Sequence, residues 1–368
     1  MKLISQSRWR SFDWGILFAA IFLVLTSLAT LYSLELNQDS PDFSLLRRQG
    51  LAAGIGIAIF VAFQFIDFRH LKDYSLAFYA IGVITLAALF PFGATIHGTT
   101  GWFRFAGVTF QPVELFKIIL IIAFAKFFAD KRDANHPWII MHSLAIMAFP
   151  AILLYLQPDV GSLLVLVAVW IGFLVVMRLR RVYILSFVFA GLLFSVVAWH
   201  FVLAPYQKQR IITFLDPAHD TSGSGYNVRQ SKIAIGSGDF LGRGLGLGTQ
   251  SSLNFLPEQE TDFIFAVIAE SLGFVGGALV ILLYCFLLWR MLKVTHRIKD
   301  EFGGLIALGV FFWFSFQGLS NIAMNMGLAP VFGVPLPLLS YGGSSLIASI
   351  IALGVVESVC LYSPQEAK

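Results

Sequence analysis

An aspartate at position 262 stands where a long apolar stretch begins, directly after a loop that is rich in lysine and arginine. A carboxylate at such a boundary stays ionised and can accept a proton from a hydroxyl group, for example that of a sugar. Aspartate in a first helical turn also complements the helix dipole without taking part in any reaction, so this structural explanation stays open. Because the dipole weakens the base, catalysis by Asp262 would depend on accurate positioning.

Further ionisable residues lie in or beside apolar stretches, where a charge costs about 2.5–3.5 kcal/mol on insertion scales. Glu114 and Lys117 are three residues apart and therefore share one face of a helix. They form either an internal ion pair that fixes helix packing or one wall of a polar cavity that also contains Asp159. Gln111-Pro112 marks the start of this helix, because proline is well tolerated in a first helical turn.

Two other apolar stretches contain polar groups that need partners. Glu270 lies eight residues into its stretch, roughly 12 Å along a helix axis, and this depth requires either a partner or a proton. Gln317, Asn321 and Asn325 follow each other at intervals of four residues, so they form a stripe that faces the interior of a helix bundle. The stripe serves either as packing contacts or as the lining of a cavity. Glu357 is expected to lie at the membrane interface.

The composition defines the class of protein that must position these residues. Of 368 residues, 58% are hydrophobic and 12% are charged, and the mean hydropathy is +0.80. Soluble domains carry about 25% charged residues, so a soluble enzyme and a disordered chain are both excluded. Two cysteines are too few for a disulfide scaffold. A polytopic membrane protein remains.

A transmembrane helix needs about 20 mostly apolar residues, and the apolar runs here are too long and continuous for the strands of a barrel. We therefore expect an all-α polytopic membrane protein in which residues 1–368 form a single domain. Ten transmembrane helices are predicted, at residues 14–34, 49–66, 74–91, 112–129, 138–156, 158–177, 182–204, 262–289, 302–329 and 339–361.

Lysine and arginine residues predict the orientation of these helices. With the N-terminus inside, 16 of these cations lie in the cytoplasm and 8 outside, and five of the eight fall in one long loop. The positive-inside rule then places both termini in the cytoplasm, as a multi-pass protein of the cytoplasmic (inner) membrane. The isoelectric point near 9.0 is explained by this topology, so no nucleic-acid partner is needed. The first stretch is longer than a signal-peptide core and is interpreted as a retained helix.

Two outer connections are long. Residues 205–261, between the seventh and eighth predicted spans, are expected to form a partly helical extracytoplasmic loop, with helical stretches at 206–215 and 226–235. Glycines recur between residues 236 and 248, but they match neither a dinucleotide fingerprint nor a phosphate-binding loop, so we interpret them as flexible turns. Residues 92–111 form the second connection. The histidines and cysteines show no spacing that predicts a metal site.

The chain carries several motifs that resemble the SEDS (shape, elongation, division and sporulation) family, in order along all the predicted spans. They are Gly101-Trp102-Phe103-Arg104, Gln111-Pro112-Val113-Glu114-Leu115-Phe116-Lys117, Gln157-Pro158-Asp159-Val160-Gly161, Gly225-Tyr226-Asn227-Val228-Arg229-Gln230-Ser231, Thr261-Asp262-Phe263-Ile264-Phe265, Gly333-Val334-Pro335-Leu336-Pro337 and Ser340-Tyr341-Gly342-Gly343-Ser344-Ser345. The Tyr-Asn-x-x-Gln-Ser form and the short tails are most similar to the elongation branch rather than the division branch.

This resemblance implies a peptidoglycan glycosyltransferase that polymerises lipid II and releases undecaprenyl diphosphate during cell elongation. The family's essential acidic residue corresponds to Asp262, which would act as the base for the acceptor 4-hydroxyl. A β bond made from an α-linked donor implies one inverting displacement. Arg104, Lys117, Arg210 and Arg229 would stabilise the leaving diphosphate, because cations neutralise the charge that develops on it.

The resemblance also implies that Gln111, Glu114, Asp159 and Ser344 contribute to substrate binding. A divalent cation, Mg²⁺ or Mn²⁺, could share the stabilisation of the diphosphate, although no ligand motif in the sequence indicates one. The substrate lipid II, the surrounding membrane lipids and a class B penicillin-binding protein of the elongation complex are the implied partners.

The sequence departs from the family pattern at three positions. Leu338 completes a Pro-Leu-Pro-Leu run where Pro-Leu-Pro-Phe is more common. Val113 stands where serine is usual, and Ser271 stands where a second acidic residue is usual, which leaves the role of Glu270 open. The competing interpretations are a lipid II flippase, a polymerase of the division or sporulation branch, and a scaffold that only recruits a penicillin-binding protein. A transporter places its main polar groups near the membrane midplane at a repeat interface. The strongest motifs here lie at the outer edge, and no half-to-half repeat is found, which favours the enzyme.

Overall fold

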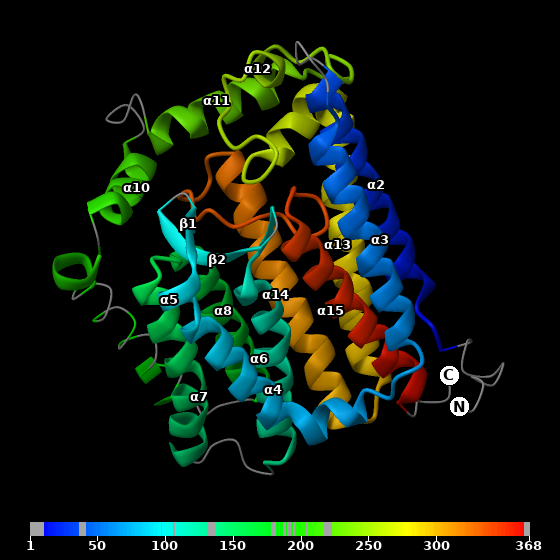
Figure 1. Ribbon diagram of the computed structural model, residues 1–368, viewed down its shortest axis with the longest axis vertical. Coiled ribbons are helices and arrows are strands. Elements are labelled where there is room, and N and C mark those ends of the chain that lie inside the picture. Colours follow the sequence, from blue (N-terminus) through cyan, green and yellow to red (C-terminus); the bar gives the residue numbers. More distant parts are fainter. Residues whose placement is uncertain are drawn as a thin grey trace.

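The computed structural model describes residues 11–36, 42–96, 98–105, 107–131, 137–177, 198–203, 205–216 and 223–363, with scattered positions between 182 and 196. The chain is mostly helical, and its long helices run side by side (Figure 1). The α-helices are α2 (Trp14–Leu36), α3 (Ser44–Phe63), α4 (Arg69–Ala87), α5 (Leu89–Phe92), α6 (Pro112–Ala129), α7 (Pro137–Leu156), α8 (Val160–Val176), α10 (Pro205–Leu215), α11 (Ser224–Ser237), α12 (Thr249–Ser252), α13 (Ile264–Arg297), α14 (Glu301–Asn325) and α15 (Gly343–Tyr362); Ala198–Val202 form a π-helical turn.

Seven helical segments among the described residues are long and apolar enough to cross a membrane: α2, α3, α4 together with α5, α7, α13, α14 and α15. The chain is therefore a multi-pass membrane protein. Helices α6 and α8 also coincide with predicted spans, but α6 carries three charged residues and α8 has only 17 residues. The predicted span at 182–204 lies largely outside the described residues, so the number of ten helices stays a prediction.

Helix α14 lies at the centre of the bundle, where it contacts α6, α8, α13 and α15 (Figure 1). Small residues permit this close packing. A Cβ atom added at Gly309 of α14 would lie 2.6 Å from Ile121 of α6 and 3.0 Å from Phe173 of α8. The aromatic side chains of Trp313 and Phe314 fill the remaining interior space. Since α14 is enclosed on all these sides, the polar stripe that it carries has a fixed position.

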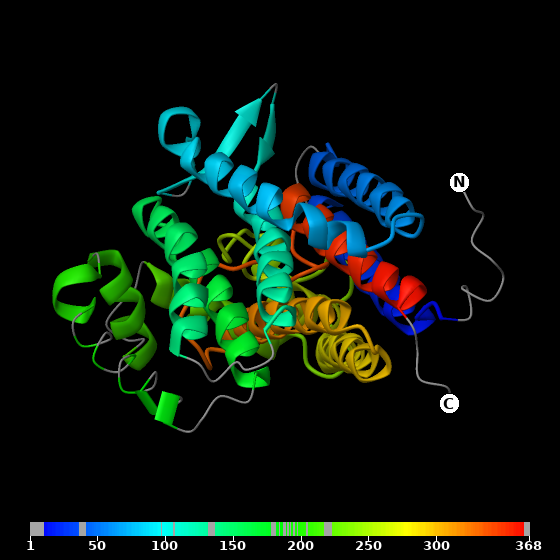
Figure 2. The ribbon, with the colours of Figure 1, turned by 90° about the horizontal axis from the view of Figure 1, so that it is seen from below.

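The expectation of an all-α chain is wrong between residues 94 and 110. Strands β1 (Ala94–Ile96), β2 (Thr99–Phe105) and β3 (Val108–Phe110) form an antiparallel sheet in the order β1-β2-β3 at the edge of the bundle (Figure 2). Threonine and aromatic residues are enriched in β2, and such side chains favour extended backbone. Gly98 and Gly107 have φ angles of 78° and 82° in the two turns, a conformation that glycine adopts without steric cost.

Helix α13 begins two residues later than predicted and is interrupted at Gly273, where φ is 66° and ψ is −164°. A segment of the long loop fills this break. The carbonyls of residues 270–271 accept hydrogen bonds from the amides of 243–244, and the amides of 274–275 donate to the carbonyls of 239–240, at 2.9–3.2 Å. The loop thus satisfies the backbone groups that the break in the helix leaves without intrahelical partners.

The interpretation of the glycines between 236 and 248 as turns is incomplete. Gly242, Gly244 and Gly246 have the positive φ angles of turn residues, but an added Cβ atom at Gly238, Gly242 or Gly248 would also collide with α13. A Cβ atom at Gly273 would lie 2.3 Å from the amide nitrogen of Gly242, so the two backbones can approach only because both residues lack side chains.

Glu270 has the partners that its depth requires. Its carboxylate accepts hydrogen bonds from the amides of Gln250 (2.8 Å) and Ser251 (3.1 Å) and so stabilises the N-terminal turn of α12.

The opposite end of the bundle contains a buried ionic cluster. Arg290 of α13 donates two hydrogen bonds to the carboxylate of Asp13, at 2.8 and 2.6 Å. The amide of Asp13 in turn donates to Glu357 of α15 at 3.0 Å. Glu357 is fully buried within the protein near the end of α15, and its expected position at the membrane interface stays a prediction. The cluster joins the ends of α2, α13 and α15.

Candidate active site

Asp262 lies in the turn just before α13, and its backbone is held by the stripe on α14. The Asp262 carbonyl accepts hydrogen bonds from the side-chain amides of Asn321 (3.0 Å) and Asn325 (2.9 Å). The Asn325 side-chain oxygen also accepts a hydrogen bond from the amide of Ala266 in the first turn of α13, at 3.1 Å. The predicted stripe does face the bundle interior, and its function here is to fix the segment that carries the carboxylate.

The loop from residue 331 to residue 342 surrounds the same turn. Asn321 donates a second hydrogen bond to the carbonyl of Val334 at 2.9 Å. The Ser340 hydroxyl donates to the carbonyl of Thr261 at 2.6 Å, and the amide of Tyr341 donates to the carbonyl of Glu260 at 2.8 Å. Residues 260–262 are therefore tied to this loop as well as to α14.

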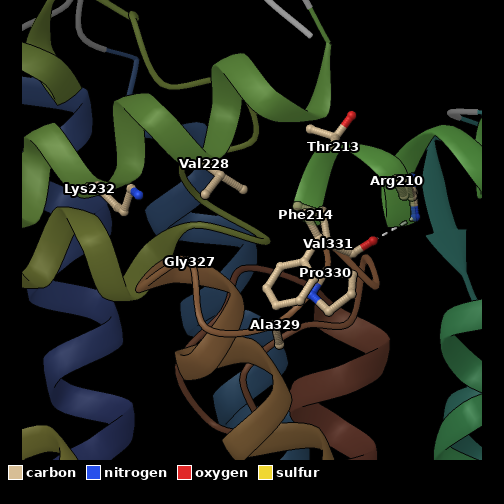
Figure 3. A pocket seen from close by; sticks show the side chains of 9 residues that line it. All are labelled: Arg210, Thr213, Phe214, Val228, Lys232, Gly327, Ala329, Pro330 and Val331. Carbon is tan, nitrogen blue, oxygen red and sulfur yellow. Dashed lines mark hydrogen bonds between the residues drawn. The ribbon is translucent and has the colours of Figure 1, made fainter. Parts of the chain in front are cut away.

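Arg210 and Asp262, both predicted to belong to the site, converge at Gly333. A methyl group added at Gly333 would lie 3.7 Å from Nη1 of Arg210 and 3.7 Å from Oδ2 of Asp262. The Arg210 guanidinium, which α10 supplies, also donates to the carbonyl of Val331 at 3.2 Å (Figure 3). A carboxylate and a cation thus flank one small space above a glycine, and no side chain from the loop separates them there.

A second group of predicted residues meets where α6, α8 and α15 begin. The amide of Gln111 donates to the Ser344 hydroxyl at 3.0 Å, and the Gln111 side-chain amide donates to Oδ2 of Asp159 at 3.3 Å. The other oxygen of Asp159 accepts from the amide of Ser162 at 3.0 Å and caps α8. The structure therefore brings Gln111, Asp159 and Ser344 together, as three helix starts that share hydrogen bonds.

Glu114 and Lys117 form a buried ion pair on α6, with 2.7 Å between Nζ and Oε1 and only 1% of either side chain exposed. Lys117 also donates to the Gln317 side chain at 2.9 Å and lies 5.2 Å from the ring centroid of Trp313. Gln317 then donates to the carbonyl of Pro335 at 2.7 Å, which connects the pair to the loop around Asp262. The internal ion pair, one of the two sequence interpretations, is what the structure contains.

The remaining predicted cations lie on exposed elements. Arg104 is part of β2, opposite Thr109 of β3, and its side chain is exposed. Arg229 is on α11 and is also exposed.

A small cavity of about 20 Å³ adjoins Arg210, and it is lined by a cation that was not among the predicted site residues (Figure 3). This residue is Lys232 of α11, which the sequence showed only as one of several charges in a long loop. Apolar side chains form the cavity wall between the two cations: Phe214, Val228, Pro330 and Val331. In the sequence, Lys232 follows Arg229 by three residues, so the two share one face of a helix. This spacing does not indicate which of the two cations lines the cavity.

Among the described residues, no group of three or more His, Cys, Asp or Glu side chains is arranged to hold a metal ion. Arg210 is a cation that the chain itself brings near Asp262, and Lys232 lies across the small cavity from Arg210.

Fold and site together define a class of protein: a multi-pass membrane protein with a fixed carboxylate and a cation at one end of a helix bundle. The chain belongs to the FtsW/RodA/SpoVE family of cell cycle proteins, whose sequence model matches residues 10–365.

Relatives in this family are similar over most of their length. The peptidoglycan glycosyltransferase MrdB of Escherichia coli is 36% identical over 344 residues, which are 92% of each chain. The stage V sporulation protein E of Bacillus subtilis is 35% identical over 88% of each chain.

Solved structures show the same fold. A chain in a peptidoglycan synthase complex, described as coordinating polymerization and crosslinking, has a TM-score of 0.82 and 30% identity, and the match covers 95% of this chain and 97% of that one. The rod shape determining protein RodA of Thermus thermophilus has a TM-score of 0.72 and 29% identity, with 96% and 98% covered.

Proposed function

We propose that this protein is a peptidoglycan glycosyltransferase that polymerises lipid II into glycan strands during cell elongation. Membership of the family and the 36% identity to a peptidoglycan glycosyltransferase support the reaction class. The observation that carries the mechanism is the convergence of Asp262 and Arg210 at Gly333. An inverting transfer needs a base on the acceptor side and a positive charge on the side of the leaving group, and these two residues supply both.

In this mechanism the Asp262 carboxylate accepts the proton of the acceptor sugar hydroxyl as the hydroxyl oxygen attacks the anomeric carbon of the donor. The bond between that carbon and the diphosphate breaks in the same displacement, and the electron pair leaves on the diphosphate. Arg210 stabilises the charge that develops there, since a fixed cation is most effective where charge increases in the transition state. Asn321 and Asn325 hold Asp262 in place but do not contact substrate.

The structure changes the order of the diphosphate-binding candidates. Arg210 becomes the first, because it adjoins Asp262, and Lys232 is added across the cavity. Lys117 moves to a supporting role, because its charge is already paired with Glu114 away from any surface. Arg104 and Arg229 remain candidates for guiding the anionic substrate toward the site.

The proposal includes an orientation in which ten helices span the cytoplasmic membrane and both termini lie in the cytoplasm. Asp262 and the loop of residues 205–261 then face the outside, where lipid II is polymerised. A class B penicillin-binding protein is proposed as the transpeptidase partner, which agrees with the similarity to a chain in a peptidoglycan synthase complex.

Polymerisation of labelled lipid II by the purified protein in detergent, with and without its transpeptidase partner, tests the proposed activity. Detergent removes the difference between leaflets, so a flippase has no function in this assay. We expect glycan chains longer than one disaccharide. Absence of chains under both conditions, together with transfer of lipid II across vesicle membranes, would establish the flippase instead.

A further inference from the structure

Residues 240–255, which we call the apolar loop, expose large hydrophobic side chains outside the long helices. Between 44% and 78% of each of the following side chains is exposed: Phe240, Leu241, Leu245, Leu247, Leu253 and Phe255. Arg243 is the only charged residue in the segment. Exposed apolar clusters of this kind mark a surface that contacts a membrane or another protein.

Two contacts define the height of the apolar loop along the bundle. The amide of Gly246 donates to the hydroxyl of Ser33, in the last turn of α2, at 2.6 Å. The ring of Phe240 stacks on that of Phe274 in α13, with 6.0 Å between the ring centroids. The loop therefore lies level with the ends of two membrane-spanning helices rather than beyond them.

Phe274 belongs to the part of α13 that crosses the hydrocarbon. From residue 271 to residue 289 the helix carries no charge, and Arg290 is the first cation after it. At 1.5 Å per residue this stretch extends about 28 Å, close to the thickness of the hydrocarbon core. Phe274 is three residues from the start of that stretch, so the ring that stacks on it, Phe240, lies within the apolar layer.

Most backbone amides of the apolar loop find partners inside the protein, as hydrocarbon requires of polar groups. Amides at 242–244, 246, 247 and 250–255 all donate to protein acceptors. The side chain of Arg243 reaches back to the carbonyl of Ser237 at 2.6 Å and lies 3.8 Å from Asp239. The single charge is thus held at one end of the segment, away from its leucines.

From these observations we infer that the apolar loop is inserted into the acyl-chain region of the outer leaflet. Its surface continues the exposed apolar face of α13, where Leu279 and Leu282 are also exposed. The apolar loop is held by hydrogen bonds to α2 on one side and to the break in α13 on the other. We therefore expect it to keep this position whether or not another protein is bound. This inference concerns lipid contact and does not depend on the proposed catalytic activity.

Spin labels in proteoliposomes that contain the protein alone test the insertion. Leu241→Cys, Leu247→Cys and Leu253→Cys are made in a Cys285→Ser background, with Leu279→Cys as the lipid reference and Glu301→Cys as the aqueous reference. The accessibility of each label to oxygen, which concentrates in hydrocarbon, is compared with its accessibility to a water-soluble nickel chelate. Thermal unfolding identifies any variant that does not fold, and three positions give independent readings.

We expect the oxygen-to-nickel ratio at positions 241, 247 and 253 to match that at 279 and to exceed that at 301 by at least about 5-fold. A ratio equal to that at 301 would overturn the inference. It would mean that the apolar loop faces water in the isolated protein and that its occupant is another protein.

Discussion

Asp262 is positioned through its backbone as well as by its place next to Arg210. Two asparagine side chains donate to its carbonyl, and the carboxylate lies with Arg210 over Gly333. A general base needs this arrangement, since its effect depends on a fixed distance to the proton that it accepts. Other charges in the bundle, such as Lys117 and Glu114, are instead satisfied by each other.

Lys117→Met provides the first prediction, because it removes one member of the buried pair. The variant should lose about 3–5 kcal/mol of unfolding free energy, since the Glu114 charge is left buried without its partner. The double variant Lys117→Met/Glu114→Gln should recover much of that loss. Thermal unfolding in detergent measures both. A single variant with unchanged stability but no polymerisation would show instead that Lys117 contacts substrate.

The types of residue in the candidate site could be predicted from the sequence, but their pairing could not. Asp262 and Arg210 fall in one group and Gln111, Asp159 and Ser344 in another, a grouping that the sequence did not indicate. Which outer cation adjoins Asp262 depends on where the 205–261 loop folds back, and the loop sequence contains several equivalent lysines and arginines. Lys232 was missed for this reason.

At the scale of elements, α14 acts as the support for the site and α13 as the anchor of the outer loop. Helix α14 is enclosed by four helices, and it turns three amide side chains toward residues 262, 334 and 335. Helix α13 accepts the loop into its break at Gly273. Helix α14 therefore sets the position of Asp262, and the break in α13 sets the position of residues 239–244 of the outer loop.

Replacement of Asn325 by aspartate should lower the polymerisation rate by about 10-fold or more. The side chain keeps its shape and its acceptor for Ala266, but it no longer donates to the carbonyls of Asp262 and Asn321. Asn321 still donates to the Asp262 carbonyl, but the new buried oxygen meets acceptors in place of a donor, and such an unmatched buried group costs about 1–3 kcal/mol. Steady-state kinetics should show the loss mainly in kcat, because Asn325 does not contact substrate. Ser315→Ala on the same helix is the matched control, since its hydroxyl has no hydrogen-bond partner among the described residues. Equal rates for Asn325→Asp and the control would exclude the positioning role.

Gly273→Ala should destabilise the protein by about 2 kcal/mol or more. The positive φ is strained for alanine, and the new methyl group would overlap the backbone of Gly242. Gly304→Ala is the control on α14, where an added Cβ meets nothing within 4 Å, and it should be neutral or slightly stabilising. The two melting temperatures are compared in the same detergent. If Gly273→Ala has the same melting temperature as the Gly304→Ala control, the break in α13 is not required for the stability of the protein.

At the scale of the whole molecule, hydropathy predicts the long helices well because each span must satisfy its own backbone hydrogen bonds. Every predicted span other than 182–204 coincides with a described helix. The sheet of residues 94–110 was not predicted, because its strands are short and hydropathy identifies only long apolar runs. The break at Gly273 was not predicted, since it is set by contacts with residues 239–244 and not by local hydropathy. The hydrogen bond between Glu357 and Asp13 was missed because the two residues lie at opposite ends of the sequence.

The predicted orientation of the bundle can be measured with two variants that each add one cysteine to a Cys285→Ser background, in which the remaining Cys360 is buried. Asp42→Cys is between α2 and α3, and Glu301→Cys is at the first residue of α14, on the side that Arg290 and Arg297 predict to be cytoplasmic. A membrane-impermeant maleimide should label position 42 in intact spheroplasts and position 301 only after the membrane is permeabilised. The reverse pattern would invert the topology and place Asp262 on the wrong side for lipid II polymerisation.

The central claim is that Asp262 is the base of a polymerase, and Asp262→Asn tests it most directly. This variant keeps the size of the side chain and the backbone hydrogen bonds to α14 but removes the proton acceptor. In detergent with labelled lipid II, glycan synthesis should fall by about 10²–10⁴-fold at an unchanged melting temperature. Asp239→Asn, at an exposed position in the outer loop, should polymerise normally. Chain formation by Asp262→Asn at the rate of the unsubstituted protein would contradict the account.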